Sequence, residues 1–227
     1  MPIALCAGLV LIGLAVAATW PGFDPKVIAV RGNHRVSRGE ILARAAIAPR
    51  VSIWLQNGDA IAKRIETIPY IATASVRRVP PATIRIVVAE RAPFAVLRSD
   101  ADAALVDRTL RVLEPATGDD SYPVLVVKPG LTFWPGEFVR TAAVIELRDA
   151  YEAIEARHIV PEELGYDGFG GLVVTLRGGL RLLLGGENDL GKKLTLAAAI
   201  LSQVVSRERR VTAIDLRAPS APVLVYR

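Results

Sequence analysis

Residues 65–93 constrain the fold of this 227-residue chain more than any other stretch. Apolar and polar residues alternate on both sides of Pro80 and Pro81, which is typical of two half-buried strands. A proline has no backbone N–H to give to a strand ladder, so the two prolines belong in the connection. The stretch therefore predicts a β-hairpin that separates one folded segment from the next. The apolar positions of the two strands are Ala74, Val76, Ile84, Ile86 and Val88.

An uncharged apolar run occupies residues 3–20. About 18 to 20 apolar residues span the hydrocarbon of a bilayer, so residues 1–22 are predicted to form a transmembrane anchor. Trp20 suits the membrane interface, where tryptophan is enriched. A cleaved signal peptide is the alternative, because the small residues Ala15 and Ala17 fit a cleavage site, although no basic residue precedes the run.

Composition argues against several function classes. The net charge is +5, but Lys and Arg are spread along the chain and aromatic residues make up only 6%, so we predict no nucleic-acid partner. The single cysteine, Cys6, permits neither a disulfide within the chain nor a thiolate zinc site. His34 and His158 lie far apart and are interpreted as solvated residues. We therefore predict no catalytic, metal or cofactor-binding residues, no cofactor, and no enzyme activity.

Residues 26–92 show the order β-α-α-β-β. A short strand at residues 27–31 precedes Ser37 and Glu40, which form the capping box of a first helix. A second helix near Asp59 has one apolar stripe, and both stripes must cover one face of a small three-stranded sheet. The stripe of the second helix comprises Ile61, Ile65 and Ile68.

Residues 93–227 are richer in strands. Gly178 and Gly179 both accept positive φ and connect two apolar segments, which indicates a hairpin. Helices are expected at residues 138–157 and 190–205. The expected fold class is α+β: an N-terminal transmembrane helix, the β-α-α-β-β domain, and a mixed β-sheet domain with flanking helices. Its strands are expected at residues 94–97, 104–106, 110–112, 172–176, 180–184, 212–217 and 222–226.

The segment GENDLGKK at residues 186–193 comes close to the phosphate-binding pattern G-x-x-x-x-G-K-[ST]. Lys193 replaces the Ser or Thr whose hydroxyl would hold magnesium. The chain also lacks the alternating strand–helix order of nucleotide hydrolases. We interpret the segment as a turn that leads into a helix capped by Asp189, with solvated lysines, and predict no nucleotide binding.

Several segments resemble the FtsQ/DivIB cell-division family. They read VRGNHRVSRGEI at residues 30–41, IPYIATASVRRVPPATIRI at residues 68–86 and ERAPFAVL at residues 90–97. VTAIDLR near the C-terminus resembles the closing strand of the family, and Leu110 ends a V-D-x-x-G turn without the glycine. The resemblance implies an anchor at residues 1–22, a POTRA domain at 26–92 and an FtsQ-type β-domain at 93–227. Matching positions are Gly32, Asn33, Pro69, Tyr70, Ile71, Ala74, Val76, Arg78, Pro80 or Pro81, Thr83, Ile84, Glu90, Arg91 and Pro93.

The resemblance implies a bitopic scaffold of the divisome in the bacterial inner membrane, with its C-terminal domains in the periplasm at the division septum. Family members bind FtsB and FtsL and connect them to septal peptidoglycan synthesis. An exposed C-terminal edge strand would pair with a partner segment. Alternatively, these residues only complete the sheet or block its edge with proline. The candidate partner-binding residues are Asp215, Leu216, Arg217, Ser220, Val223, Leu224 and Val225.

Two departures bear on this edge: Ala218 replaces an aromatic residue of the family pattern, and Pro222 cannot donate to a ladder. Arg77 and Arg78 are a possible second docking surface on the first domain. The main alternative function is that of a POTRA-type periplasmic chaperone or transport-associated binding module.

Overall fold

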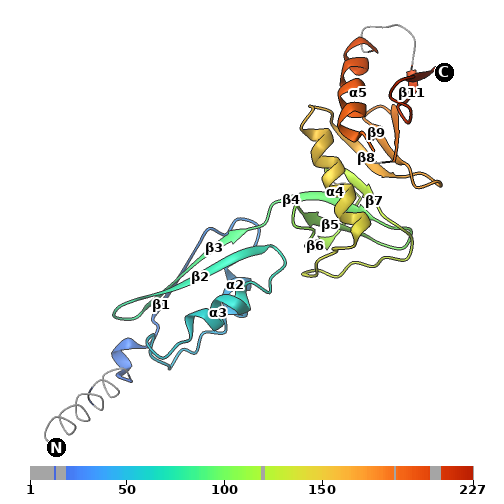
Figure 1. The fold of residues 1–227 in the computed structure, drawn as a ribbon. Coiled ribbons are helices and arrows are strands. Elements are labelled where there is room, and N and C mark those ends of the chain that lie inside the picture. Colours follow the sequence, from blue (N-terminus) through green and yellow to red (C-terminus); the bar gives the residue numbers. More distant parts are fainter. Residues whose placement is uncertain (1–12, 14–18, 119–120, 187, 205–210, 227) are drawn as a thin grey trace, which may run out of the picture. The chain divides into compact units, whose positions relative to one another are not determined.

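The computed structural model describes residues 13, 19–118, 121–186, 188–204 and 211–226. The chain falls into two units, Met1–Ala92 and Pro93–Arg227, which are treated separately (Figure 1). The anchor expected at residues 1–22 lies almost wholly outside the described residues. Among the helices that are described, none is long and apolar enough to cross a membrane.

The first unit has the expected β-α-α-β-β order. Its three strands are arranged β1-β3-β2, with β1 parallel and β2 antiparallel to β3. A short 3₁₀ turn, η1, precedes them. The elements are η1 Pro21–Phe23, β1 Val27–Arg31, α2 Arg38–Ala45, α3 Gly58–Ile65, β2 Ile71–Val79 and β3 Thr83–Glu90.

Side-chain caps begin both helices of the first unit. The Ser37 hydroxyl accepts the Glu40 N–H at 3.1 Å, as the capping pattern predicts, and the Asn57 side chain accepts the Ala60 N–H at 3.0 Å. Helix α2 ends at Ala46, whose φ is 46°. The left-handed backbone at Ala46 ends the helix, and Ala46 is exposed.

The hairpin of β2 and β3 alternates as predicted. Ile84 and Ile86 are fully buried with Ile61 and Ile65 of α3, whereas Arg85 and Val87 face solvent. The two helices thus cover one face of the sheet and leave the other open, which is how a single apolar stripe on each helix can be buried.

The second unit is built on one nine-stranded sheet with the order β12-β11-β10-β9-β8-β7-β4-β5-β6. Strands β4, β7 and β8 are mutually parallel, and so are β10 and β11. The elements are β4 Pro93–Arg98, β5 Ala103–Asp107, β6 Val112–Pro115, β7 Val124–Val126, α4 Ala142–Glu155, β8 Pro161–Tyr166, β9 Leu172–Leu176, β10 Arg181–Gly185, α5 Leu190–Val204, β11 Val211–Asp215 and β12 Val223–Tyr226.

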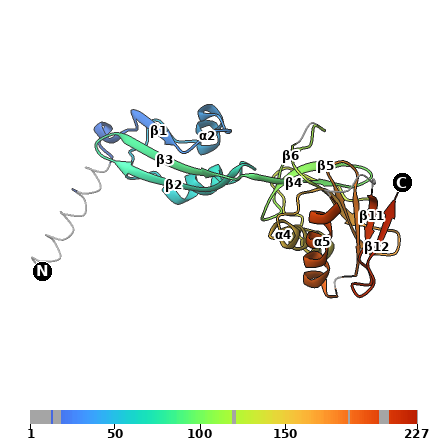
Figure 2. The same ribbon diagram turned by 90° about the horizontal axis from the view of Figure 1, so that it is seen from above.

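Helices α4 and α5 lie on the same side of this sheet (Figures 1 and 2). Leu147 and Ile154 of α4 and Leu194 of α5 are fully buried in one core with Leu125 and Leu182 of the strands. The expected mixed sheet with flanking helices is therefore confirmed.

Two strands of the second unit were not predicted as strands, and two elements begin at least two residues later than expected. Strand β7 has only three residues, which is too short for a clear pattern. Strand β8 has the sequence PEELGY, and its polar residues do not show the alternation typical of a strand. The strand expected at residues 110–112 begins at Val112, because Leu110 has a φ of 63° and forms a turn. The helix expected from residue 138 begins at Ala142.

Candidate functional site

Strand β12 forms one end of the nine-stranded sheet. It pairs with β11 in antiparallel register, with Ile214 opposite Leu224 and Asp215 opposite Val223. Within the described residues no further strand pairs with its outer side. Val223 is 55% exposed and Val225 44%, whereas Leu224 packs against the core. This edge therefore offers both a strand ladder and exposed apolar side chains to a partner.

At the opposite end of the sheet, another segment of the chain covers the start of β6. The N–H of Val112 in β6 donates to the Glu137 carbonyl at 2.8 Å, and the Gly136 N–H donates to the Val112 carbonyl at 2.8 Å. Arg111 forms an antiparallel bridge with Phe138. In the described part of the chain, β6 is thus covered at its start, whereas no strand pairs with the outer side of β12.

An ion pair lies in the turn between β11 and β12. The Asp215 carboxylate accepts hydrogen bonds from the Arg217 Nε at 3.0 Å and from its Nη2 at 2.5 Å. The hydrogen bond from Arg217 lowers the pKa of Asp215, so the pair stays charged at neutral pH. Arg217 itself is exposed, so its guanidinium edge stays accessible from solvent.

The structure brings most of the predicted partner-binding residues together. Some of them lie on the exposed edge, and others are buried beneath it. Val223, Leu224 and Val225 lie on β12, and Ser220 is exposed in the turn before it. Leu216 is fully buried and donates its N–H to the Leu183 carbonyl of β10 at 2.8 Å. The side chain of Leu216 therefore belongs to the core that supports the edge and not to its surface.

Arg77 and Arg78 point to opposite faces of the first sheet. The Arg78 guanidinium donates to the Ile53 carbonyl at 2.8 Å and to the Gln56 carbonyl at 2.6 Å, which ties β2 to the segment between the helices. Arg77 lies opposite Arg85 on the open face and is exposed. The two arginines therefore do not share a surface.

The segment that resembles a phosphate-binding loop has a structural role. Lys193 is only 4% exposed, and its ammonium donates to the carbonyls of Leu184 at 2.8 Å and Gly186 at 2.7 Å. The expectation of a solvated lysine is wrong here, because the ammonium satisfies the backbone at the end of β10. Lys192 is exposed and pairs with Asp189 at 2.8 Å. Neither lysine is arranged to cradle a phosphate.

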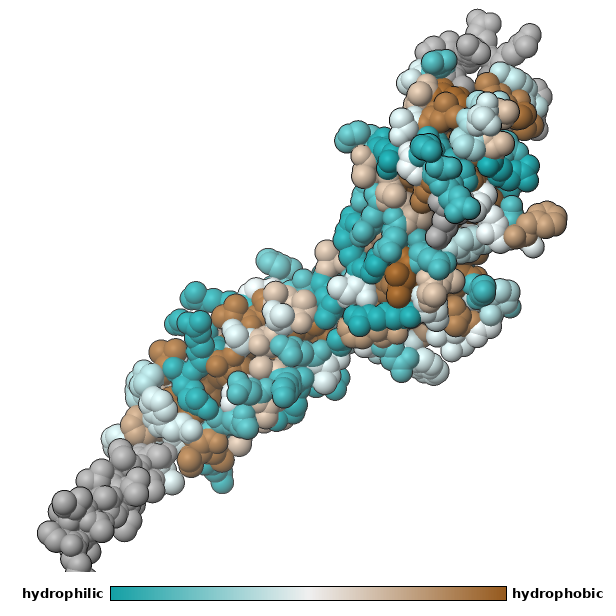
Figure 3. All heavy atoms as spheres, in the orientation of Figure 1, coloured by the Kyte–Doolittle hydropathy of each residue, from teal (hydrophilic) through white to brown (hydrophobic). Residues whose placement is uncertain are grey.

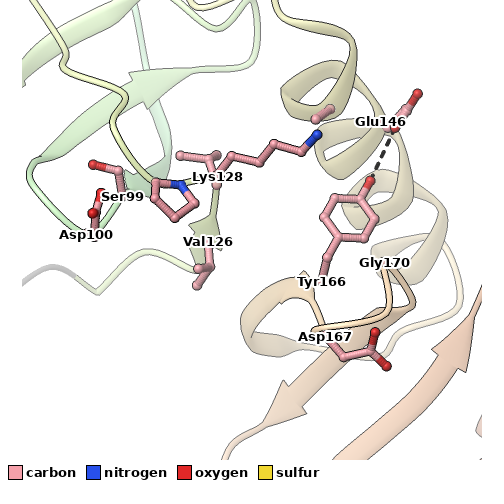
Figure 4. Close-up of a pocket in the computed structure, with 11 residues that line it drawn as sticks. Ser99, Asp100, Val126, Lys128, Glu146, Tyr166, Asp167 and Gly170 are labelled. Carbon is pink, nitrogen blue, oxygen red and sulfur yellow. Dashed lines mark hydrogen bonds between the residues drawn. The ribbon is translucent and has the colours of Figure 1, made fainter.

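A cavity of about 720 Å³ lies where the parallel strands β4, β7 and β8 end, beside the first turns of α4 (Figure 4). Its Tyr166 hydroxyl donates to Glu146 at 3.4 Å. Backbone N–H groups of Gly171 and Phe169 donate to Asp167 and lower the pKa of that carboxyl. Sequence reasoning missed the cavity, because its lining comes from three strand ends that only the sheet order brings together. In the described part of the chain, no cluster of His, Cys, Asp and Glu could hold a metal ion.

Comparison with known proteins agrees with this architecture. Residues 23–91 match the model of the FtsQ-type POTRA domain, and residues 95–217 match the C-terminal domain of cell division protein FtsQ/DivIB. The second match alone covers more than half of the chain.

Several curated proteins similar to this chain are named cell division protein FtsQ. The Geobacter sp. relative is 29% identical over 226 residues, which cover 94% of this chain and 81% of the relative. The Syntrophotalea carbinolica relative is 28% identical over 85% of this chain and 70% of its own length. The Rhizobium meliloti relative is 24% identical over 89% of this chain, which spans only 62% of that protein. The chain therefore belongs to the FtsQ/DivIB family of cell division proteins.

Proposed function

We propose that this protein is a bitopic scaffold of the divisome that links FtsB- and FtsL-like proteins to septal peptidoglycan synthesis. Residues 1–22 anchor it in the inner membrane, and the domains at residues 26–92 and 93–227 lie in the periplasm at the division septum. Family membership and the apolar N-terminal run support this placement.

One observation carries the proposed mechanism: within the described residues no strand pairs with the outer side of β12, while β6 at the other end of the sheet is covered at Val112. A partner segment adds to the outer side of β12 by main-chain hydrogen bonds. The exposed Val223 and Val225 contact apolar side chains of that segment, because directly opposite and diagonal residues of neighbouring strands touch.

The surroundings of β12 define where pairing starts and stops. Pro222 has no N–H, so the useful ladder begins at Val223. Arg217 follows the end of β11 that lies beside the start of β12. Its exposed guanidinium pairs with Asp215 and can also contact an acidic residue of the partner. Ala218 leaves this end without an aromatic anchor, so the strand contacts carry more of the affinity.

Affinity measurements test the pairing. The full chain in nanodiscs is titrated with a fluorescent FtsB-like coiled-coil segment, and Kd is compared among wild type, Val223→Lys and Val225→Lys. Both variants place a charge on an exposed apolar position, so we expect binding to weaken about tenfold or more with the fold intact. Val160→Lys is the matched control, because Val160 is 75% exposed and is not on β12.

Unchanged Kd in both lysine variants, at an unchanged unfolding midpoint, would rule out pairing at this edge. A proline or a charge at Leu224 is less selective, because this side chain also packs against the core. Weaker binding by such a variant counts only when its unfolding midpoint matches that of the wild type.

A further inference from the structure

The first unit exposes large apolar side chains at its N-terminal end. Trp20 is 64% exposed, Trp54 46% and Leu55 56%. Together with Phe23, these residues are called the aromatic end. Figure 3 shows brown and tan residues in this part of the first unit. A folded domain normally buries such side chains, so their exposure points to a contact with another apolar phase.

The rings of the aromatic end form one connected surface from two separate segments. The centroids of Trp20 and Phe23 lie 5.7 Å apart, and those of Phe23 and Trp54 lie 6.2 Å apart, both edge to face. A Cβ on Gly22 would lie 3.0 Å from the Trp20 ring, so the absence of a side chain there lets the indole pack on the backbone.

The segment that carries Trp54 and Leu55 is firmly held by polar contacts. Ile53 is fully buried, and its N–H donates to the Phe23 carbonyl at 2.9 Å. The Gln56 amide donates to the carbonyls of Ala48 at 2.7 Å and Val51 at 2.9 Å, in addition to the contacts from Arg78. Polar groups of this segment thus form hydrogen bonds within the domain. The side chains of Trp54 and Leu55 remain exposed on its surface.

The chemistry of this end fits a lipid bilayer better than a protein partner. Trp20 directly ends the uncharged apolar run of residues 3–20. Indole rings concentrate at the level of the lipid headgroups, where one side is apolar and the N–H stays wet. Lys26 and Arg50 are exposed close to Phe23 and Val51 in the sequence, where they can meet lipid phosphates.

We infer that the aromatic end docks on the bilayer, with Trp54 and Leu55 among the lipid headgroups beside the anchor. The POTRA domain is then held at the membrane surface by two points of its chain rather than hanging from one. The placement of Trp20 at the membrane surface rests on the proposed membrane anchor. The placement of Trp54 rests on the geometry of the loop that carries it.

Depth-dependent fluorescence quenching tests this docking. The chain contains three tryptophans, and single-tryptophan variants are made by Trp→Phe substitution at the other two positions. Each full-length variant is reconstituted in phosphatidylcholine–phosphatidylglycerol vesicles, with or without bromine near the top of the acyl chains. We expect bromine to lower Trp54 emission about twofold or more, because the ring lies at headgroup depth. Trp134 is 65% exposed in the second unit and serves as the control, with no change expected.

The outcomes separate this inference from the proposed anchor. If Trp20 is quenched and Trp54 is not, the anchor stands and the docking is overturned. If neither is quenched, both are overturned. Equal quenching of Trp54 and Trp134, or a blue-shifted Trp54 that bromine does not quench, also overturns the docking; the latter indicates a protein cover such as a second copy.

A charge placed in the loop provides a second measurement. Leu55→Glu is expected to reduce the quenching of Trp54 at least about twofold, since a carboxylate resists entry among anionic headgroups. Val160→Glu, a change at an exposed valine in the other unit, should leave it unchanged. Full quenching of Trp54 in the Leu55→Glu protein would contradict the proposed insertion.

Discussion

The N–H of Leu110 donates to the Asp107 carbonyl at 2.9 Å and closes a turn in which Leu110 has a φ of 63°. The Asp107 carboxylate holds the same turn by accepting the N–H groups of Thr109 at 2.8 Å and Arg111 at 3.0 Å. The family pattern has glycine where Leu110 stands. Leu110 is fully buried, so its side chain fills the core while its backbone takes a conformation that favours glycine.

At position 110 a glycine variant should therefore be more stable than an alanine variant, which is the reverse of the usual order. Leu110→Ala loses the buried side chain but keeps the strained φ, and we expect the unfolding free energy to fall by about 2–5 kcal/mol. Leu110→Gly loses the same side chain but relieves the backbone, so it should be more stable than the alanine variant by about 1 kcal/mol. Urea denaturation of both proteins measures the difference, and a less stable glycine variant would contradict the strain at this turn.

Glu90 closes a second turn, far away in sequence. Its carboxylate accepts the N–H groups of His34 at 2.8 Å, Arg35 at 2.9 Å and Val36 at 2.9 Å. Gly32 begins this turn with a φ of 84°, and a Cβ there would lie 2.1 Å from the Val88 carbonyl oxygen. The matching family positions Gly32 and Glu90 thus build one structure that joins β1, β3 and the start of α2.

Acid should weaken the first unit through Glu90. Desolvation by itself raises the pKa of this carboxyl, but the three backbone donors outweigh it and bring the pKa below the ordinary value of 4.5. A group with a lowered folded pKa stabilises the fold above its unfolded pKa, and this stabilisation is lost as pH falls through the folded pKa. We expect stability to decline below about pH 4.5 and Glu90→Gln to flatten that decline.

The same substitution has a cost at neutral pH. The introduced amide would keep one acceptor oxygen for three donors, so Glu90→Gln should lower the unfolding free energy at pH 7 by about 1–3 kcal/mol. Denaturation at pH 7 and pH 4 measures both effects. An unaltered pH profile in the variant would show that other carboxylates control the acid response.

Two adjacent lysines should differ in how much their substitution destabilises the fold. Lys193→Met leaves the carbonyls of Leu184 and Gly186 without their buried donor, and we expect a loss of about 2–4 kcal/mol. Lys192→Ala removes only an exposed ion pair with Asp189, so the unfolding midpoint should not change. Neither protein should bind ATP in calorimetry. Retained ATP binding by the wild type that Lys192→Ala abolishes would restore the nucleotide-binding interpretation.

The neighbouring arginines of β2 form another matched pair. Arg78→Ala removes both donors that hold the Ile53 and Gln56 carbonyls, and the first unit should lose about 1–3 kcal/mol. Arg77→Ala changes an exposed residue opposite Arg85 and should be neutral or slightly stabilising, because like charges face each other across the strands. Thermal denaturation of the two variants checks this, and equal midpoints would argue against the role of Arg78.

Local patterns in the sequence predicted much of this fold. The alternation around Pro80 and Pro81, the Ser37 cap and the turn at Gly178 and Gly179 depend on neighbouring residues, and each is found in the structure. The open C-terminal edge at Val223–Tyr226 was also expected, but through family resemblance.

Long-range contacts account for what the sequence did not show. Strand β8 reads as polar, and it is a strand because β7 and β9 pair with its two sides. Glu90 is matched only through the family resemblance, because its partners are N–H groups more than fifty residues away. Lys193 is expected to be solvated from its sequence neighbours, because they do not indicate that its ammonium meets the carbonyl of Leu184 at the end of β10. Such roles depend on the tertiary fold, and a single sequence carries no periodic signal for them.

The cover on β6 bears on how many strands the second unit can add. A sheet open at both ends could add strands repeatedly and grow into a fibre. Here residues 136–138 lie against the start of β6 at Arg111 and Val112, so under the proposed pairing a strand would add at β12. Two copies that paired through this edge would meet β12 to β12, in a symmetric dimer that uses both β12 edges. A partner strand and a second copy of the chain would then compete for the same edge.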